Sequence, residues 1–478
     1  MLFSSIPFLY YFLPIVILIY FAVPKCLKNT VLLLSSLFFY AWGEPIYVFL
    51  MVSSIAVNYF LGLLIEKFKD KKLSRFFLII SVVFSLGLLG YFKYADFFIE
   101  NFVRLTGMSV PLLNIALPIG ISFYTFQIIS YTVDVYRGSV KSQKNPITLG
   151  AYISLFPQLI AGPIVRYSDV EKQLSSRSHS SDKAAEGIRR FIIGLSKKIL
   201  LANTLGELCA VFHQGNDLSV LFYWLYAIAF MLQIYFDFSG YSDMAIGLGK
   251  ILGFDFLENF NYPLISSSIS EFWRRWHISL GSWFRDYVYF PLGGSRVKSR
   301  LRLGFNLFTV WLLTGIWHGA NWTFVLWGSL HGIYQIVGAI TKKPREKLYA
   351  KLHIKTDSML FALWQRFWTF VLVCISWILF RANSISDVGV LLERLASPWG
   401  SLADTLIALD LNLVAILITV LSIVILSILD RIGADESIAE TGTLSRQYTA
   451  GLTALVVAVA WCLLLSVGGA SAFIYFQF

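Results

Sequence analysis

The sequence contains uncharged, apolar runs that are long enough to cross a lipid bilayer. Residues 303–341 form a run of 39 residues without Asp, Glu, Lys or Arg, and residues 45–65 form another of 21. A helix needs about 20 such residues to span the hydrocarbon core. Of the 478 residues, 57% are hydrophobic and only 14% are charged. A soluble globule cannot bury that much apolar surface, so the sequence predicts an all-α, polytopic membrane protein.

We expect about eleven transmembrane helices, together with re-entrant and interfacial helices. The run at 303–341 is long enough for two short crossings. The run at 145–165 carries Pro146, Pro157 and Pro163, so a plain span and a re-entrant segment both stay open for it. The other expected spans are 6–24, 29–43, 45–65, 76–92, 105–133, 218–236, 360–380, 411–429 and 447–466.

The basic residues predict how the chain is oriented. Lys25 and Lys28 follow the first run, and five Lys or Arg lie in 65–75. With the blocks 137–198, 274–302 and 342–366, these loops hold 32 of the 39 Lys and Arg. Because Lys and Arg concentrate in cytoplasmic loops, the N-terminus is expected outside the cytoplasm. The net charge of +11 then reflects topology and attraction to the lipid bilayer, and no nucleic-acid partner is expected.

Several kinds of site are not expected from this sequence. The four cysteines, Cys26, Cys209, Cys374 and Cys462, lie far apart without a CxxC pair, so neither a disulfide framework nor a metal site is predicted. There is no GxSxG, Walker A or HExxH motif. The glycine run at 247–253 indicates helix packing rather than a dinucleotide loop.

His318 is the strongest candidate for chemistry. It is the sixteenth residue of the 39-residue run, and basic residues flank both ends of that run. Both ends should therefore face the cytoplasm, and the chain must turn back near His318, with Gly315 and Gly319 permitting the turn. About 15 helical residues reach ~23 Å, short of a ~30 Å core, which places His318 inside the membrane. The alternative is a histidine that only packs between helices. His331 lies 13 residues further on and is a second candidate for a functional role. The alternative is a histidine that only makes a structural hydrogen bond.

His277 lies in a different setting. Read as one helix, 271–287 carries an apolar stripe within an arc of about 80° at 100° per residue, formed by Phe272, Trp276, Leu280, Trp283 and Tyr287. Such a helix is expected to lie at the cytoplasmic interface. His277 and Trp273 sit at the edge of the stripe. Arg274 and Arg275 can hold donor phosphates or extend toward lipid phosphates.

Two long stretches resemble the hallmark segments of a known family. They are FWRRWHISLGSWFRDYVYFPLGG at 272–294 and GIWHGANWTFVLWGSLHG at 315–332. They are similar to the membrane-bound O-acyltransferase (MBOAT) family, in its bacterial branch for alginate and peptidoglycan O-acetylation. The segments 116–138, 156–167 and 234–263 also look like this branch. The resemblance runs to about residue 380, so we expect a core at 1–380 and a separate C-terminal region at 381–478.

The resemblance implies a fold, a site and an activity. The fold would be a ring of helices around a central funnel or tunnel, in the bacterial cytoplasmic (inner) membrane. His318 and His277 would be the family's two catalytic histidines, and His331 a further one near the substrate. The donor would be an acyl-CoA or an acyl-carrier thioester from the cytoplasm, with no bound cofactor. The acceptor would be a cell-envelope or secreted polysaccharide, reached through an extracytoplasmic acetyltransferase or esterase-like partner.

Acyl transfer to a hydroxyl needs a base and stabilisation of an oxyanion. A neutral imidazole at membrane depth suits the base, and a transient acyl-histidine is the alternative. The indoles of Trp317 and Trp322 and the amide of Asn321 are candidates for positioning a substrate. Substitution of His318 by Ala is expected to leave no packing void. Two other functions stay open: D-alanyl transfer to teichoic acid from a carrier protein, and a transporter or acyl channel without catalysis.

The orientation can be tested by cysteine labelling in whole cells. In a chain without its own cysteines, Asp70→Cys and Arg345→Cys should resist a membrane-impermeant thiol reagent, because both positions are predicted to face the cytoplasm. Permeabilised cells, in which both positions should react, provide the control. Efficient labelling of either position in intact cells would contradict the orientation.

Overall fold

The computed structural model describes residues 1–214 and 220–395, and these residues form helices and connecting loops without strands. This agrees with the predicted all-α class. The predicted spans at 411–429 and 447–466 lie outside the described residues. The predicted boundary near residue 380 stays a prediction for the same reason.

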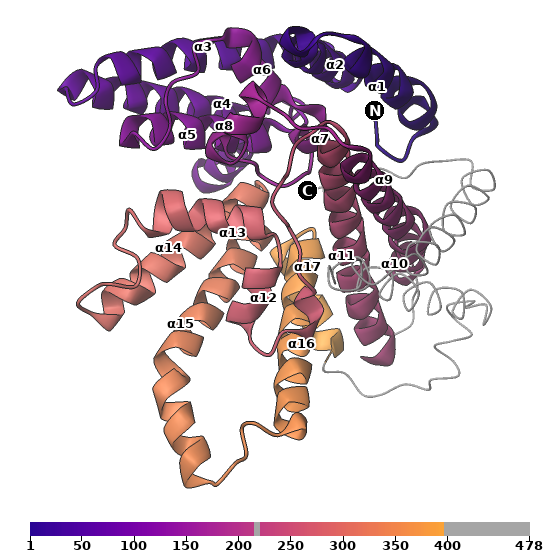
Figure 1. The fold of residues 1–478 in the computed structure, drawn as a ribbon. Coiled ribbons are helices and arrows are strands. Elements are labelled where there is room, and N and C mark those ends of the chain that lie inside the picture. The colour runs from indigo at the N-terminus through magenta and orange to yellow at the C-terminus, as the bar shows by residue number, and fades with distance from the viewer. Residues whose placement is uncertain (215–219, 396–478) are drawn as a thin grey trace. The chain divides into compact units, whose positions relative to one another are not determined.

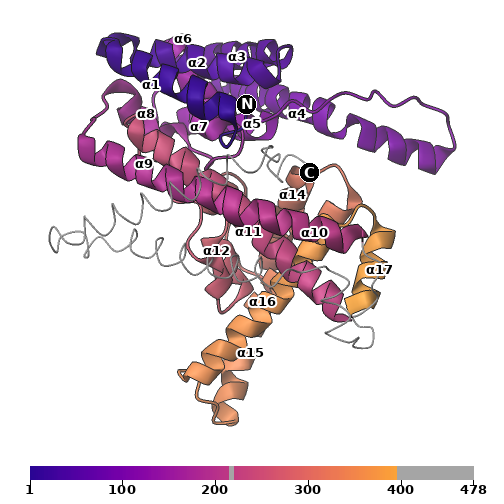
Figure 2. The ribbon, with the colours of Figure 1, turned by 90° about the vertical axis from the view of Figure 1, so that its right-hand side faces the viewer.

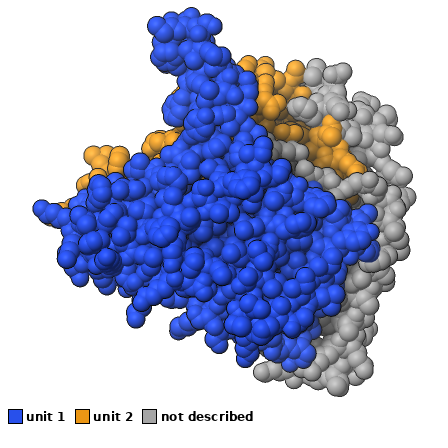
Figure 3. All heavy atoms as spheres, turned by 90° about the horizontal axis from the view of Figure 1, so that it is seen from above, with its two compact units in different colours: residues 1–199, 240–257, 434–477 blue, residues 200–239, 258–433, 478 orange. Residues whose placement is uncertain are grey.

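The described residues divide into two compact units, drawn in blue and orange in Figure 3. Unit 1 contains residues 1–199 and 240–257, and unit 2 contains residues 200–239 and 258–395. Helix α11 (Val220–Ile251) contributes residues to both units, as does the short helix η3 (Lys197–Asn203).

The remaining helices of unit 1 are η1 (Pro7–Phe12), α1 (Leu13–Ala22), η2 (Lys25–Leu27), α2 (Lys28–Gly43), α3 (Tyr47–Lys67), α4 (Lys72–Thr106), α5 (Ile121–Arg137), α6 (Pro146–Ser154), α7 (Phe156–Leu159), α8 (Tyr167–Ser175) and α9 (Ser181–Ser196). Those of unit 2 are α10 (Thr204–Gln214), η4 (Pro263–Ile265), α12 (Ile269–Arg275), α13 (Ile278–Phe284), η5 (Arg285–Tyr289), α14 (Arg300–His318), α15 (Trp322–Lys351), α16 (Met359–Arg381) and α17 (Ile385–Leu395).

Five of the described helices are long and apolar enough to cross a membrane: α3, α4, α11, α15 and α16. The chain is therefore a multi-pass membrane protein. Helices η1 and α1 form a shorter apolar segment. The prediction of a span at 105–133 is wrong at its start, because α4 continues to Thr106 and α5 begins only at Ile121. Pro111 and Pro118 lie between them, and proline cannot donate a helical hydrogen bond. The run at 145–165 folds into α6 and α7, which are too short to be a plain span.

Helices α3, α4 and α5 of unit 1 pack through buried polar side chains. The hydroxyl of Ser81 on α4 donates to Oδ1 of Asn58 on α3 at 2.6 Å, and it lies 3.1 Å from the hydroxyl of Thr132 on α5. Lipid provides no hydrophobic force between helices, so such hydrogen bonds help to hold them together. In Figure 2, the end of α4 and the loop that follows it project to the right, away from the other helices of unit 1.

Glycines bring α9 into backbone contact with the part of α11 that belongs to unit 1. A Cβ added at Gly194 would lie 2.4 Å from the carbonyl oxygen of Gly240, and one added at Gly187 would lie 2.6 Å from that of Gly247. The packing role predicted for the glycine run at 247–253 is thus confirmed at Gly247. Beside this contact, the carboxylate of Asp243 pairs with Arg190 and Lys197, each at 2.9 Å, so the buried charges compensate one another.

Unit 2 is organised around an antiparallel pair of helices, α14 and α15. Helix α15 also contacts α12, α16 and α17, and α12 contacts α13 and α16. In Figure 1, α15 and α16 run next to each other and are joined by a loop at the lower edge of the view. The two halves of the charge-free run at 303–341 therefore form a hairpin, as the sequence predicts.

The glycine contact in unit 1 provides a test of the packing. Gly194→Ala should lower the stability by about 1–3 kcal/mol, because the new methyl group meets backbone that cannot rotate away. The matched control is Gly90→Ala in α4, where a Cβ meets nothing within 4 Å. The midpoint of thermal unfolding in detergent, followed by size-exclusion chromatography, measures both. Equal midpoints for the two variants would show that the close approach is absent.

Candidate active site

The turn between α14 and α15 positions His318. Helix α14 ends at His318, residues 319–321 form the turn, and α15 begins at Trp322. Asn321 caps α15, since its Oδ1 accepts the N–H of Thr323 at 3.0 Å. A Cβ added at Gly319 would lie 2.1 Å from the ring of Phe324, so any other residue there would require this buried ring to move. The predicted turn beside His318 is confirmed.

Gly315 has a different role from the predicted one. It lies inside α14 rather than in the turn, and a Cβ there would come within 2.4 Å of the carbonyl oxygen of Phe324 and 3.0 Å of Cα of Gly328. Gly328 on α15 faces the carbonyl oxygen of Trp311 in the same way. These two glycines let the backbones of α14 and α15 touch. The close approach fixes the end of α14, and His318 with it.

His318 is enclosed by aromatic rings. Its side chain is only 8% exposed, and its ring centre lies 4.9 Å from that of Trp317, 5.0 Å from Trp327 and 5.2 Å from Phe380. The expectation that alanine at this position leaves no void is therefore wrong. Removing a ring packed on three sides opens a cavity, so glutamine is the better substitution for testing chemistry.

The segment 271–287 is not one helix. Helix α12 ends at Arg275, and His277 has the left-handed dihedrals φ 46° and ψ 53° before α13 begins at Ile278. Asn259 explains the break, because its backbone carbonyl accepts the N–H of Ile278 at 3.0 Å and its Oδ1 accepts that of Ser279 at 3.3 Å. These bonds replace those of a continuous helix. The predicted apolar stripe is still buried from Phe272 to Trp283, and Tyr287 is half-buried.

The same asparagine sets the protonation of His277. Nδ1 of His277 lies 3.0 Å from Oδ1 of Asn259, an oxygen that can only accept hydrogen bonds. Nδ1 therefore carries the proton, and Nε2 presents a lone pair. Nε2 is buried and has no hydrogen-bond partner among the described residues. Burial lowers the pKa of His277 to about 3, so the imidazole is neutral at physiological pH.

His331 has the opposite arrangement. The indole N–H of Trp273 on α12 donates to Nδ1 of His331 at 3.1 Å, so the proton of this imidazole is on Nε2. Nε2 is again buried without a hydrogen-bond partner among the described residues. His277 thus offers an acceptor in its buried setting, whereas His331 offers a donor. The structural hydrogen bond considered for His331 exists, and it leaves the second nitrogen available.

The rings of these residues form a continuous chain in unit 2. The ring of His277 lies 6.4 Å from that of Trp317, and Trp317 meets His318 edge to face. Trp327 lies between His318 and His331, at 5.0 and 4.9 Å. Trp273 completes the chain at 4.9 Å from His331. We call this set the histidine–tryptophan cluster; its members are Trp273, His277, Trp317, His318, Trp327 and His331.

Four residues predicted for the site are not members of this cluster. Arg274 is exposed, and Trp322 is 44% exposed. Arg275 pairs with Glu271 at 2.9 Å and donates to the carbonyl of Asn261, which joins α12 to the preceding loop. Nδ2 of Asn321 donates to the carbonyl of Asn383 at 2.9 Å. The side chains of Arg275 and Asn321 therefore make structural contacts.

Asn259, Trp327 and Phe380 are site residues that were not predicted from the sequence. Trp327 had a usable signal, because it precedes His331 by four residues and so shares its helix face. Asn259 precedes His277 by eighteen residues in a loop, where no periodicity connects the two. Among the described residues, no group of three or more His, Cys, Asp or Glu is arranged to hold a metal ion.

Comparison with known protein families matches residues 139–382, which include the whole cluster, to the membrane-bound O-acyltransferase family. The chain belongs to this family. It is 42% identical to the probable alginate O-acetylase of Pseudomonas aeruginosa, over 83% of this chain and 75% of that protein. It is 36% identical to the peptidoglycan O-acetyltransferase of Helicobacter pylori, over 81% and 78%. The teichoic acid D-alanyltransferase of Bacillus subtilis is more distant, at 31% identity over 47% and 59%. The protein is therefore an acyltransferase of the membrane-bound type.

The role of Asn259 in orienting His277 can be tested. Asn259→Ala should lower acyl transfer by roughly 10²-fold, because the ring loses the contact that fixes its position and tautomer. Asn259→Asp keeps the acceptor and adds a negative charge, which raises the pKa of His277. Its activity should therefore fall as the pH is lowered through that raised pKa.

The measurement is the ester-linked acyl content of the cell envelope and exported polymers, released by mild alkali at several pH values. Ser282→Ala, which removes a hydroxyl bonded to the carbonyl of Ser279, is the control. A purely structural Asn259 would give an aspartate variant with the wild-type pH profile.

Proposed function

We propose that this acyltransferase moves an acetyl group from a cytoplasmic thioester toward hydroxyls of a cell-envelope or secreted polysaccharide. The histidine–tryptophan cluster is the observation that supports it best. The cluster combines buried imidazoles, of which that of His277 is neutral, with indole rings, and an imidazole acceptor is what an attacking hydroxyl needs. The two relatives with broad coverage are named as O-acetylases, and this favours acetyl as the group transferred.

In the proposed reaction, His318 is the general base. The hydroxyl oxygen attacks the thioester carbonyl, the new C–O bond forms and the C–S bond breaks. The hydroxyl proton passes to the imidazole and then to the departing thiolate. Groups with buried N–H donors, such as Trp327 and His331, are candidates for stabilising the oxyanion, because such donors act strongly in a site without water. A transient acyl-histidine is the alternative route.

The proposal assigns the two sides of the membrane different substrates. An acyl-CoA or an acyl carrier protein supplies the thioester from the cytoplasm, and His277 serves the donor side. The acceptor lies outside, within reach of a funnel enclosed by the membrane helices in the cytoplasmic membrane. In the route through an extracytoplasmic acetyltransferase or esterase-like partner, the attacking hydroxyl belongs to that partner, which then passes the acetyl group to a hydroxyl of the polymer and recovers its own hydroxyl.

D-alanyl transfer from a carrier protein is the second candidate. The relatives named for it share lower identity and match about half of this chain, whereas the O-acetylases match four-fifths of it. This difference supports acetyl transfer. A transporter without catalysis is not favoured, because the family is one of acyltransferases.

The base assignment is tested by replacing His318 with glutamine. Glutamine fills much of the space between Trp317, Trp327 and Phe380 but takes up no proton near neutral pH. His318→Gln should therefore lower acetylation by about 10²–10⁴-fold, the usual contribution of a positioned base. The ester-linked acetate of the exported polysaccharide, normalised to the amount of membrane-inserted protein, is the measurement.

His353→Gln is the matched control, since His353 is exposed in the loop between α15 and α16. It should acetylate at the wild-type level. An active His318→Gln variant would remove proton transfer from the role of His318 and leave only a hydrogen bond. Release of D-alanine instead of acetate would contradict acetyl transfer and support D-alanyl transfer, the second candidate.

A further inference from the structure

Unit 1 contains a small polar cavity at one end of the first helical hairpin. Its volume is about 310 Å³, and it lies between the η2 connection, the first turn of α2 and the end of α8 with the loop that follows. The side chains that characterise it are Lys25, Lys28, Asn29, Ser176, Arg177 and His179. Three are basic, namely Lys25, Lys28 and Arg177, and no acidic side chain of the described residues lines the cavity.

Arg177 is held in a fixed orientation. Its Nη2 donates to Oδ1 of Asn29 at 2.7 Å, and its guanidinium lies 4.7 Å from the ring centre of Phe254 and 5.8 Å from that of Tyr20. Asn29 is fixed in turn, because its Nδ2 donates to the carbonyl of Leu174 at 3.0 Å. A guanidinium placed in this way is preorganised for an anion, and planar forks of this kind match phosphate oxygens.

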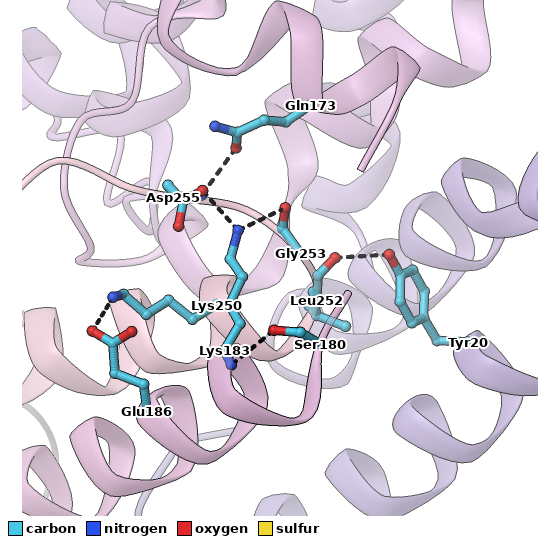
Figure 4. A network of polar contacts seen from close by, with 9 residues as sticks. All are labelled: Tyr20, Gln173, Ser180, Lys183, Glu186, Lys250, Leu252, Gly253 and Asp255. Carbon is cyan, nitrogen blue, oxygen red and sulfur yellow. Dashed lines mark hydrogen bonds and ion pairs between the residues drawn. The ribbon is translucent and has the colours of Figure 1, made fainter. Parts of the chain in front are cut away.

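Two acidic residues near this region are already paired with other cations. Asp255 accepts from Lys183 at 2.7 Å, and Glu186 pairs with Lys250 (Figure 4). Lys25, Lys28 and Arg177 form no ion pair with any described residue. Their charges are therefore left for a ligand or for solvent.

The cations also act on one another. Partial burial, followed by the charges of Arg177 and Lys25, lowers the pKa of Lys28. Burial, followed by the charges of Lys28 and Arg177, lowers the pKa of His179. A negative charge placed among these groups would relieve both effects.

Long-range contacts support the segments that line the cavity. The hydroxyl of Tyr20 on α1 donates to the carbonyl of Leu252 at 2.7 Å, and Nε2 of His179 lies 3.0 Å from the same hydroxyl (Figure 4 shows the Tyr20 contact). Gln173 accepts the N–H of Asp255 at 2.9 Å. These bonds join α1, α8 and the loop after α11, so the cavity belongs to the folded unit rather than to a single loop.

We propose that this cavity binds a phosphate group. Lys25 and Lys28 follow directly on the apolar helix α1, and basic residues that flank apolar membrane segments are attracted to the phosphates of anionic lipids. The N-terminus of α2 starts at Lys28 without a side-chain cap and adds its partial positive charge. The volume is at the lower end for ligand sites and suits a headgroup or a small phosphate compound. The site rests on the geometry of unit 1 and is independent of the proposed function.

Native mass spectrometry of the full-length protein in detergent tests the lipid source. Phosphatidylglycerol is the probe, and diacylglycerol, which lacks the phosphate, is the comparison ligand. Inorganic phosphate and pyrophosphate, scored by the shift of the thermal unfolding midpoint, test the soluble source. Binding of at least one phosphate probe should weaken about tenfold or more in Arg177→Gln and in Lys28→Gln, because each loses a charged contact. Lys71→Gln, an exposed lysine of the same unit, should bind like the wild type.

If Arg177→Gln does not fold, Lys28→Gln still provides the test. The side chain of Lys28 forms no hydrogen bond or ion pair with a described residue, and its ammonium lies over the rings of Tyr20 and Phe21. Loss confined to phosphatidylglycerol would identify a lipid headgroup, and loss confined to the inorganic probes a soluble ligand. Equal binding by wild type, Lys28→Gln and Lys71→Gln would overturn the proposal. None of these readouts depends on acetyl transfer.

Discussion

The backbone contact between Gly315 and Gly328 determines the geometry of the candidate site. Two helices with side chains at these positions would be held apart, and neither the end of α14 nor the face of α15 would stay where it is. His318 is the last residue of α14, whereas Trp327 and His331 lie on the facing side of α15. The aromatic contacts of His318 are thus a consequence of close helix packing, and any side chain larger than hydrogen at the contact would disturb three site residues together.

A second constraint comes from the loop that precedes α12. Asn259 accepts hydrogen bonds from the backbone and hydroxyl of Ser279 and from His277, and its own carbonyl caps the start of α13. The buried Asn259 therefore both interrupts the helix at His277 and fixes the tautomer of the His277 ring. Trp273, two residues before the helix end, chooses the tautomer of His331. The left-handed backbone of His277 is a strained conformation that persists because these bonds require it.

The sequence was informative wherever one local pattern was sufficient. Absence of charge over 303–341 predicted a hairpin with His318 at its turn, and the apolar stripe of 271–287 predicted which side of that segment is buried. Prediction from the sequence failed where a residue far away in the chain determines the local structure. The helix break at His277 depends on Asn259, and the role of Gly315 depends on Gly328 in the other arm of the hairpin. The predicted number of spans was affected as well. The apolar run at 145–165 folds into α6 and α7, and each of these helices is too short to cross a membrane.

The histidine–tryptophan cluster of unit 2 and the charged residues of unit 1 differ in how they treat charge. In unit 2, imidazoles and indoles are buried together, and none of these rings carries a permanent charge. Burying ions there would require partners for each charge. In unit 1, charge is kept where it is compensated, as at Asp243 with Arg190 and Lys197, or at the end of an apolar helix where headgroups and solvent are near, as at Lys25 and Lys28. A site for a proton transfer needs the first arrangement, because a neutral base must stay neutral until the substrate arrives, whereas a site for a permanent anion needs the second.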